Sequence, residues 1–169
     1  MGDIFKEQIV KRRQTSMDTA KRIGIGVGVL LIFILALNFV PVVAPVAIMV
    51  AMFGGFYLSS FLKKEYEYVF TNGELDIDII YNRSRRKRVF SSHVNNFEIM
   101  AHVEDMTYAG EFHRAQETLD YSSGTVGPDT YAFLISRGGK YQKIIIEPNE
   151  KMMTAIRGSL SRSKLHLRK

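Results

Sequence analysis

An apolar stretch of forty uncharged residues near the N-terminus constrains this chain more than any other feature. No Asp, Glu, Lys or Arg occurs from residue 23 to residue 62. A transmembrane helix needs roughly 20 apolar residues to cross about 30 Å of hydrocarbon, so this stretch is long enough to cross twice. Asn38, Pro41 and Pro45 interrupt it near the middle, where a helix should end and the chain turn. We therefore predict a hairpin of two transmembrane helices, with the expected ranges Ile23–Phe39 and Ala44–Leu62.

Basic residues flank this stretch on both sides, whereas the turn between the two helices carries no charge. Lys21 and Arg22 precede the stretch, and Lys63 and Lys64 follow it. Positive residues accumulate beside membrane helices on the cytoplasmic side. We therefore expect a multi-pass protein of the cell membrane, with two spans and both termini in the cytoplasm.

The two spans divide the chain into four expected regions. These are a basic cytoplasmic segment (1–22), the transmembrane hairpin (23–62), a β-rich cytoplasmic domain (63–160) and a basic tail (161–169), which we expect to be frayed. Ile4, Phe5 and Ile9 stand among basic residues in the first region. That region is therefore expected to form either an interfacial helix at an anionic membrane surface or a solvated, positively charged leader.

Alternating apolar residues begin directly after the second span and predict β-structure. Tyr66–Phe70 and Leu75–Ile79 alternate on either side of an Asn72-Gly73 pair. Asn-Gly between two alternating runs is the strongest short-range signal of a β-hairpin, because both residues tolerate positive φ. Asp76 and Asp78 are expected on the solvent face of this hairpin.

The remaining elements follow from shorter patterns. Further strands are expected at Lys87–Ser92 and Phe97–Val103, a loop at Ser122–Asp129, and a second hairpin from Tyr131–Arg137 and Tyr141–Glu147 around Gly138-Gly139. Residues 104–119 remain open between helix and strand. Pro148 suits the first turn of a helix, and an apolar stripe at helical spacing follows it. That stripe consists of Met152, Met153, Ile156 and Leu160.

These elements predict a membrane α-helical hairpin followed by an α+β domain, in which a C-terminal helix covers a curved antiparallel sheet. The Tyr66–Ile79 hairpin, the strand-and-helix segment Lys143–Leu160 and the opening MGDIFKEQIVKR carry a resemblance to a known family. The chain resembles small two-span membrane proteins of Gram-positive bacteria that carry a PH-like (pleckstrin-homology-like) cytoplasmic domain. The resemblance covers the whole chain and implies an architecture, and none of its residues is a catalytic signature.

A run of basic residues is the most conspicuous candidate site. Arg83, Arg85, Arg86, Lys87 and Arg88 place five positive charges within six residues. They could contact anionic lipid headgroups, with about 1 kcal/mol for each Lys or Arg near the surface, or form a solvated hairpin loop. In lipid-binding PH domains the basic residues crowd the first hairpin loop, which we place here at Thr71–Glu74 and which lacks Lys and Arg. We expect no nucleic-acid partner, since no stacking motif or recognisable fold accompanies the run.

Glycines in the two spans suggest close helix packing. Gly24 and Gly28 lie one turn apart in the first span, and Gly54 and Gly55 offer a small surface in the second. Small residues allow membrane helices to approach closely. We therefore predict helix–helix packing at these four glycines.

The sequence offers little support for catalysis. Cysteine is absent, which excludes disulfides, a thiolate nucleophile and Cys-based metal sites. His102, Glu104, Asp105, Glu111 and His113 lie close in sequence but without metal-binding spacing, and we expect them to be hydrated surface residues. We therefore expect no enzyme activity, no metal and no cofactor.

The function that we expect is a membrane-anchored interaction module. A PH-like domain held beside the bilayer would bind a protein partner or a second copy of itself. The alternative is an anionic-lipid-sensing domain that uses the Arg83–Arg88 loop.

Overall fold

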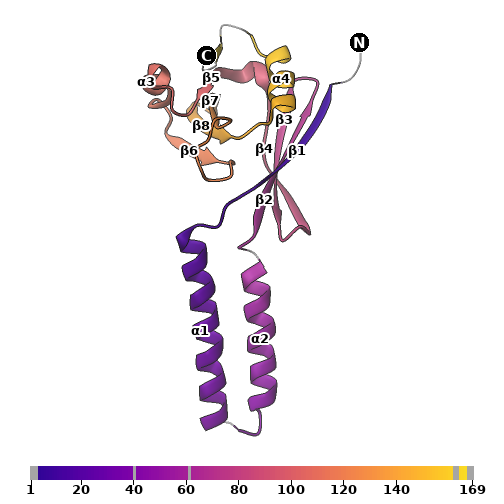
Figure 1. Cartoon of the computed structure of the whole chain (residues 1–169), viewed down its shortest axis with the longest axis vertical. Coiled ribbons are helices and arrows are strands. Elements are labelled where there is room, and N and C mark those ends of the chain that lie inside the picture. The colour runs from indigo at the N-terminus through magenta and orange to yellow at the C-terminus, as the bar shows by residue number, and fades with distance from the viewer. Residues whose placement is uncertain (1–3, 40, 61, 162–163, 167–169) are drawn as a thin grey trace. The chain divides into compact units, whose positions relative to one another are not determined.

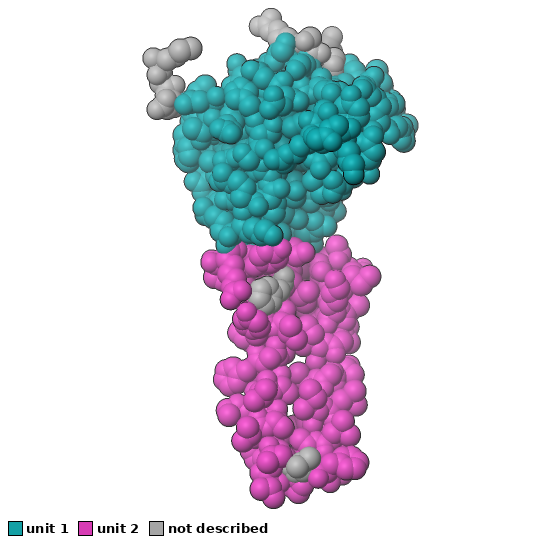
Figure 2. Space-filling view, turned by 180° about the vertical axis from the view of Figure 1, so that it is seen from behind, with its two compact units in different colours: residues 1–13, 65–80, 86–169 teal, residues 14–64, 81–85 magenta. Residues whose placement is uncertain are grey.

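The computed structural model describes all residues except 1–3, 40, 61, 162–163 and 167–169. The chain forms two compact units, shown in two colours in Figure 2. We call residues 1–13, 65–80 and 86–169 the domain, and residues 14–64 and 81–85 the helical unit. Both units are discontinuous in sequence, because the chain leaves the domain after β1 and returns to it at β2.

The helical unit contains helices α1 (Ser16–Phe39) and α2 (Ala44–Ser60), which lie side by side (Figure 1). The two segments are helical, as predicted, but α1 begins well before the expected Ile23 and α2 ends at Ser60, before the expected Leu62. A capping box explains its early start. Thr15 Oγ1 accepts a hydrogen bond from the Asp18 backbone N–H at 3.3 Å, and Asp18 Oδ2 accepts one from the Thr15 N–H at 3.1 Å. This reciprocal pair provides partners for backbone N–H groups that a helix start leaves free.

The helices of this unit leave most of their apolar surface exposed. α1 is long and apolar enough to cross a membrane, whereas α2 is a shorter apolar helix of 17 residues. Of the described residues in the two helices, only Ala36 and Ala44 are buried, while Leu31 is 54% and Phe53 71% exposed. An apolar surface of this extent marks a site of contact with lipid or with another protein.

The first sheet of the domain has four strands in the order β1-β2-β3-β4. Their bounds are Phe5–Lys11 (β1), Lys64–Thr71 (β2), Glu74–Tyr81 (β3) and Arg85–His93 (β4). The sheet is antiparallel between β1 and β2, which pair from Phe5 opposite Thr71 to Lys11 opposite Glu65.

Strand β1 overturns the prediction that residues 1–22 form an interfacial helix or a solvated leader. Its Val10 is buried in the core. The Gln8 side-chain amide donates to the Glu147 carbonyl at 2.8 Å, and its oxygen accepts from the Asn149 N–H at 2.7 Å. Local periodicity could not reveal this strand, because its partner β2 lies more than fifty residues away and its own sequence does not alternate cleanly.

The helical unit occupies the connection between two neighbouring strands. β1 runs into α1 through residues 12–15, and α2 runs into β2 through residues 61–63. The hydrogen-bonded pair of Lys11 and Glu65 stands at the point where the two strands join the helices. The first hairpin of the fold is therefore β1–β2, and not the hairpin around Thr71–Glu74 as predicted, so its loop is the helical hairpin itself.

The β2–β3 hairpin forms as predicted. Its turn residues Asn72 and Gly73 have φ of 49° and 94°, as a type I′ turn requires at both positions. A Cβ on Gly73 would lie 2.6 Å from His93 Nε2, so this position needs glycine for both its space and its φ.

The second sheet has five strands in the order β6-β8-β7-β5-β9. Their bounds are Phe97–His102 (β5), Glu117–Asp120 (β6), Tyr131–Arg137 (β7), Lys140–Ile146 (β8) and Leu165–His166 (β9). The predicted β7–β8 hairpin is confirmed, since these two strands pair antiparallel throughout.

Residues 104–119 and the C-terminal tail have structure that the sequence did not predict. The open segment 104–119 contains short helices η2 (Met106–Tyr108) and α3 (Ala109–Phe112) and then strand β6, so helix and strand both occur in it. The expected frayed tail is wrong at β9, where Leu165 pairs in parallel with Met100 of β5. The rest of that prediction falls partly on residues 162–163 and 167–169, outside the described residues.

The predicted C-terminal helix forms as α4 (Glu150–Ser159), and its apolar stripe is buried. Asn149 caps it by accepting a hydrogen bond from the Met152 N–H at 2.8 Å, so Pro148 precedes the cap and does not lie in the first turn. Helix η1 (Val94–Asn96) links β4 to β5.

A buried tyrosine connects distant parts of the domain. Tyr68 on β2 is fully buried, and its hydroxyl donates to the Tyr121 carbonyl at 2.6 Å. The same hydroxyl accepts from the Glu147 N–H at 3.2 Å. Burial raises the pKa of Tyr68. The rings of Phe97 and Phe133 are also buried, and they stack with their centroids 3.9 Å apart.

Candidate functional site

The side chains of the basic run Arg83–Arg88 differ in the contacts that they make. Arg83 and Arg85 fall within the helical unit, although Arg85 is also the first residue of β4, and Arg86, Lys87 and Arg88 fall within the domain. All five are exposed. We describe the two groups in turn.

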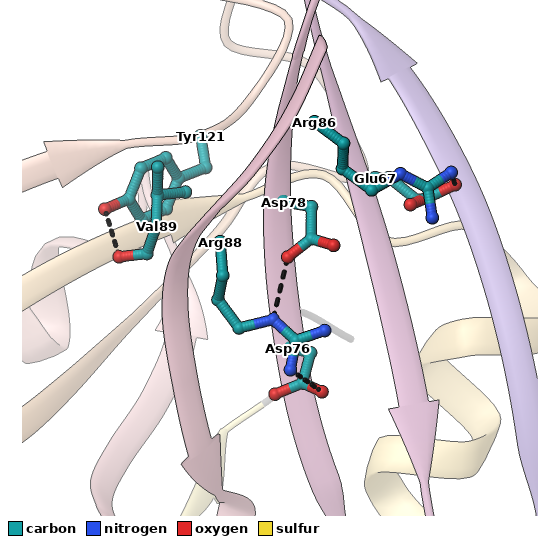
Figure 3. A network of polar contacts seen from close by, with 7 residues as sticks. All are labelled: Glu67, Asp76, Asp78, Arg86, Arg88, Val89 and Tyr121. Carbon is teal, nitrogen blue, oxygen red and sulfur yellow. Dashed lines mark hydrogen bonds and ion pairs between the residues drawn. The ribbon is translucent and has the colours of Figure 1, made fainter.

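The domain group is largely neutralised by carboxylates of β2 and β3 (Figure 3). Arg86 forms an ion pair with Glu67 of β2 at 2.8 Å. Arg88 contacts two carboxylates of β3, Asp76 at 2.7 Å and Asp78 at 2.8 Å. The Asp78 hydrogen bond, together with both carboxylates, raises the pKa of Arg88. The expectation that Asp76 and Asp78 lie on an open solvent face is thus wrong for Asp78, which is buried beneath Arg88.

Glu67 is the most unusual member of this network, and sequence reasoning missed it. Its side chain is 1% exposed, and its Oε2 has no hydrogen-bond partner among the described residues. Burial raises its pKa, and the neighbouring carboxyl of Glu7 raises it further, while Arg86 acts in the opposite direction. Alternation within β2 pointed Glu67 away from Tyr66 and Tyr68, but the pairing of β1 that covers it was invisible to local pattern.

The helical-unit group consists of Arg83, in the turn between β3 and β4, and Arg85, the first residue of β4. Asn82 and Arg83 both adopt positive φ, 48° and 57°, and the Ser84 N–H donates to the Tyr81 carbonyl at 3.1 Å. Arginine is disfavoured in this left-handed conformation, where Asn or Gly is usual. The Asn82 N–H donates to the Lys63 carbonyl at 3.0 Å and ties the turn to the residues that follow α2.

A depression of about 260 Å³ lies beside this turn at the end of α2. It is open to solvent, and Arg85 contributes to its wall. Its other lining residues are Phe56, Tyr57, Ser60, Tyr81, Asn82 and Ser84.

In the helical unit, basic residues far outnumber acidic ones, and they lie away from the α1–α2 connection. The unit contains one acidic residue, Asp18, against six basic residues. The basic residues are Lys21, Arg22, Lys63, Lys64, Arg83 and Arg85. All six belong to the start of α1, the end of α2 or the turn bonded to it, and none belongs to the α1–α2 connection.

The four glycines predicted to pack α1 against α2 behave differently from one another. A Cβ on Gly55 would lie 2.9 Å from Val29 Cγ2 and 3.4 Å from Ile25 Cγ2 of α1, so only a residue without a side chain fits. A Cβ on Gly24, Gly28 or Gly54 would meet nothing within 4 Å. The close approach therefore occurs at Gly55 alone among the four, because a Cβ at the other three positions would have open space around it.

The acidic and histidine residues of 102–113 are spread over separate structural roles. His102 is buried, with Nε2 2.9 Å from the Gly127 carbonyl and Nδ1 accepting from the Glu104 N–H. Asp105 caps helix η2, and Glu111 forms an ion pair with Arg114 at 3.0 Å. Among the described residues, no group of three His, Asp or Glu side chains could hold a metal ion.

Comparisons with known proteins give one match. The model of a family described as "Bacterial PH-like domain (DUF6106)" matches residues 2–165. Searches of curated proteins and of solved structures return no match. The matched range includes β1, both helices of the helical unit and α4, so the family pattern covers both units.

Proposed function

The chain belongs to the family of bacterial PH-like domains (DUF6106), and from this premise we propose that it is a membrane-anchored, non-enzymatic interaction module. In this proposal the helical unit crosses the cell membrane twice. The PH-like domain lies at the cytoplasmic face, where it binds a protein partner or a second copy of the chain.

One observation carries the two-span proposal: the pairing of β1 with β2. The two strands are hydrogen-bonded neighbours as far as Lys11 and Glu65, and they must therefore lie on the same side of any membrane. If α1 crosses, the chain has to cross back before Glu65. Only α2 and its short flanks are available for the return, and 17 helical residues reach about 25 Å, close to the hydrocarbon thickness of about 30 Å.

The charge distribution supports a cytoplasmic domain. Lys21, Arg22, Lys63 and Lys64 lie near the ends of α1 and α2 that join the domain, while the opposite connection carries no charge. Positive residues next to spans are retained on the cytoplasmic side. Both ends of the described chain would then face the cytoplasm.

Two surfaces of the domain suit a partner. β1 is an edge strand of its sheet, and an extended segment of another protein could pair with it. A groove of about 210 Å³ also lies along α4, lined by polar and charged side chains that include Asp129, Glu150 and Arg157. Anchoring confines the domain and any membrane-bound partner to one surface, so weak contacts of this kind suffice.

The alternative function is anionic-lipid sensing through the Arg83–Arg88 loop. The ion pairs of Arg86 and Arg88 weaken this alternative, because those two guanidinium groups already face carboxylates.

Single cysteines test the anchoring, and the natural absence of cysteine makes every label specific. Cysteine replacing Val42, which is 92% exposed in the α1–α2 connection, should react with a membrane-impermeant maleimide on intact cells. Cysteine replacing Ser84 should react only after lysis. The chain should also remain in the membrane pellet after alkaline carbonate extraction. Labelling of both positions in intact cells, or release of the chain by carbonate, would contradict a chain that spans the membrane twice with its domain in the cytoplasm.

A photo-crosslinking amino acid tests the partner surface. Placed at Ile9 on β1, which is 52% exposed, it should give a discrete crosslinked product in native membranes. Val126, which is 56% exposed in a loop, is the matched control position. Equal crosslinking patterns at the two positions would exclude β1 as the docking edge.

A further inference from the structure

We propose that the edge of strand β5 is a docking site for an extended segment of a partner protein, and that the chain's own strand β9 occupies this edge as an intramolecular competitor. This inference rests on the proposed function and deepens it, because it gives the interaction module a further docking surface and a chemical class of partner. It concerns only residues of the domain, so it does not require the helical unit to cross a membrane.

The edge of β5 offers more backbone than β9 covers. On its other side, β5 pairs with β7 from Phe97 to His102. On the β9 side, the described residues form two pairs, Met100 with Leu165 and Ala101 with His166. Because the edge of a strand is a template for another strand, a longer extended segment could pair with β5 at more positions than these two.

β9 holds this edge with few contacts. It has 2 residues, whereas strands in globular proteins usually have about five or six. Leu165 is only half-buried, although its ladder partner Met100 is fully buried. Since β7 holds β5 from the other side, a competing strand can replace β9 while the rest of the sheet stays in place.

The residues that present the edge are fixed by the core. Met100 and Ala101 are fully buried, and His102 is buried with its Nε2 2.9 Å from the Gly127 carbonyl. An edge that is already ordered costs a partner little conformational entropy on binding.

The contacts of the tail indicate the chemistry of the partner segment. The Met100 N–H donates to the Lys164 carbonyl at 2.8 Å, and Lys164 Nζ donates to the Asn95 carbonyl at 2.8 Å. Asn95 lies in η1, and basic side chains bond favourably to carbonyls at the end of a helix. A fitting segment therefore runs parallel to β5 and carries a lysine or arginine followed by an apolar residue. Its main-chain hydrogen bonds supply affinity, and these two side chains supply specificity.

The test uses the detergent-solubilised full chain and a fluorescein-labelled peptide with the sequence of residues 161–169, SRSKLHLRK. Fluorescence anisotropy measures the dissociation constant of the peptide. The variant His166→Pro keeps the length of the tail but removes a backbone N–H from β9, and proline cannot donate to a strand ladder. His166→Ala is the matched control, because it keeps that N–H.

We expect His166→Pro to bind the peptide about tenfold more tightly than the wild type, because an edge that β9 occupies about nine-tenths of the time lowers the apparent affinity by that factor. His166→Ala should bind the peptide like the wild type. Lys164→Gln, which removes the side-chain bond to Asn95, should raise the affinity by less than His166→Pro does. Unchanged affinity in both His166→Pro and Lys164→Gln would overturn the proposal. Near-UV circular dichroism verifies that each variant keeps its fold.

Two controls separate strand pairing from simple attraction between charges. A scrambled peptide of the same composition should bind more weakly, and equal binding would overturn the proposal. A photo-crosslinking residue at the Leu165 position of the peptide should attach to residues 97–102, and attachment elsewhere would overturn the site.

Two further outcomes are kept distinct. Light scattering should give the same molar mass for the wild type and His166→Pro. A wild-type dimer that His166→Pro abolishes would place the tail of a second copy on this edge and overturn the assignment to a partner protein. If the peptide does not bind, the β5 site is refuted, and crosslinking from Ile9 on β1 still tests the proposed function. If the peptide binds and Ile9 gives no crosslinked product, only the β1 edge is refuted.

Discussion

The Arg86 guanidinium donates a hydrogen bond of 2.8 Å to Glu67, although the arginine side chain is 58% exposed and the glutamate side chain only 1%. An exposed cation on β4 thus pairs with a buried anion on β2 of the first sheet. Removing the cation would leave the carboxylate buried without its partner, which costs more free energy than the pair contributes.

The first prediction follows from this asymmetry. Arg86→Gln should lower the free energy of unfolding by about 1–3 kcal/mol, because Glu67 keeps its charge in a buried site. The double variant Glu67→Gln/Arg86→Gln should recover most of the loss, since no charge is then buried. Denaturant unfolding of the detergent-solubilised chain, followed by near-UV circular dichroism, measures both. A double variant less stable than Arg86→Gln would show that the unpaired charge of Glu67 does not cause the loss.

The second prediction concerns the pH dependence of the same residue. Burial and the Glu7 carboxyl raise the pKa of Glu67 above its ordinary value of 4.5. The folded state therefore holds this proton more tightly than the unfolded state. The stability that protonated Glu67 contributes to the folded state is fully present below pH 4.5, and it is lost as the pH rises through the raised pKa.

Glu67→Gln should remove this dependence. Its unfolding free energy, compared with that of the wild type, should increase as the pH rises from 4.5 toward neutrality. Unfolding curves at a series of pH values measure the difference, and Glu7→Gln should reduce it in the wild-type background. A difference that stays constant over this range would show that the pKa of Glu67 is not raised.

The extent of successful prediction depends on how local each signal is. The hairpin at Asn72-Gly73 was predictable, because turn chemistry and alternation stand within a few residues of each other. The two helices and α4 were predictable from composition and periodicity. Their exact starts were less so, although Thr15 and Asp18 form a capping box that could have placed the start of α1.

What could not be predicted depends on long-range pairing. β1 meets β2 only after the chain has passed through both helices, so no window of sequence contains both strands. For the same reason the burial of Glu67 and the ion pairs of the basic run were hidden. Charge alone suggested an open cationic loop, whereas Arg86 and Arg88 pair with carboxylates of β2 and β3.

The third prediction tests the packing of α1 against α2. Gly55→Val should destabilise the helical unit by about 1–3 kcal/mol, because its side chain would overlap Val29, whose nearest methyl lies 2.9 Å from a Cβ at this position. Gly54→Val is the matched control, since a Cβ there meets nothing within 4 Å. Thermal unfolding in detergent, followed by far-UV circular dichroism, compares them. Adding Val29→Ala should restore stability to Gly55→Val, and failure of that rescue would argue against this contact.

The fourth prediction compares two turn glycines. Gly138→Ala places a methyl group at φ 59° with no atom within 4 Å, and should cost about 1–2 kcal/mol. Gly73→Ala should cost more, because its φ is 94° and its Cβ would lie 2.6 Å from His93 Nε2. Denaturant midpoints of the two variants measure the difference. Equal midpoints would indicate that the His93 ring moves aside at little cost.

The last prediction tests the topology on which the two-span proposal depends. Because Lys11 and Glu65 are opposite each other in the β1–β2 ladder, a two-residue Asn-Gly turn can replace residues 12–64. The shortened chain, which lacks residues 12–64, should fold into the PH-like domain without detergent. Its near-UV circular dichroism should resemble that of the full chain. A fragment beginning at Glu65 is the control. It lacks β1, so β2 loses its strand partner and the Asn149 N–H loses its acceptor, Gln8 Oε1, and it should unfold at a lower denaturant concentration. If both chains proved equally stable, β1 would be dispensable. Its pairing with β2 could then no longer serve as evidence that α2 crosses the membrane back to the side where α1 begins.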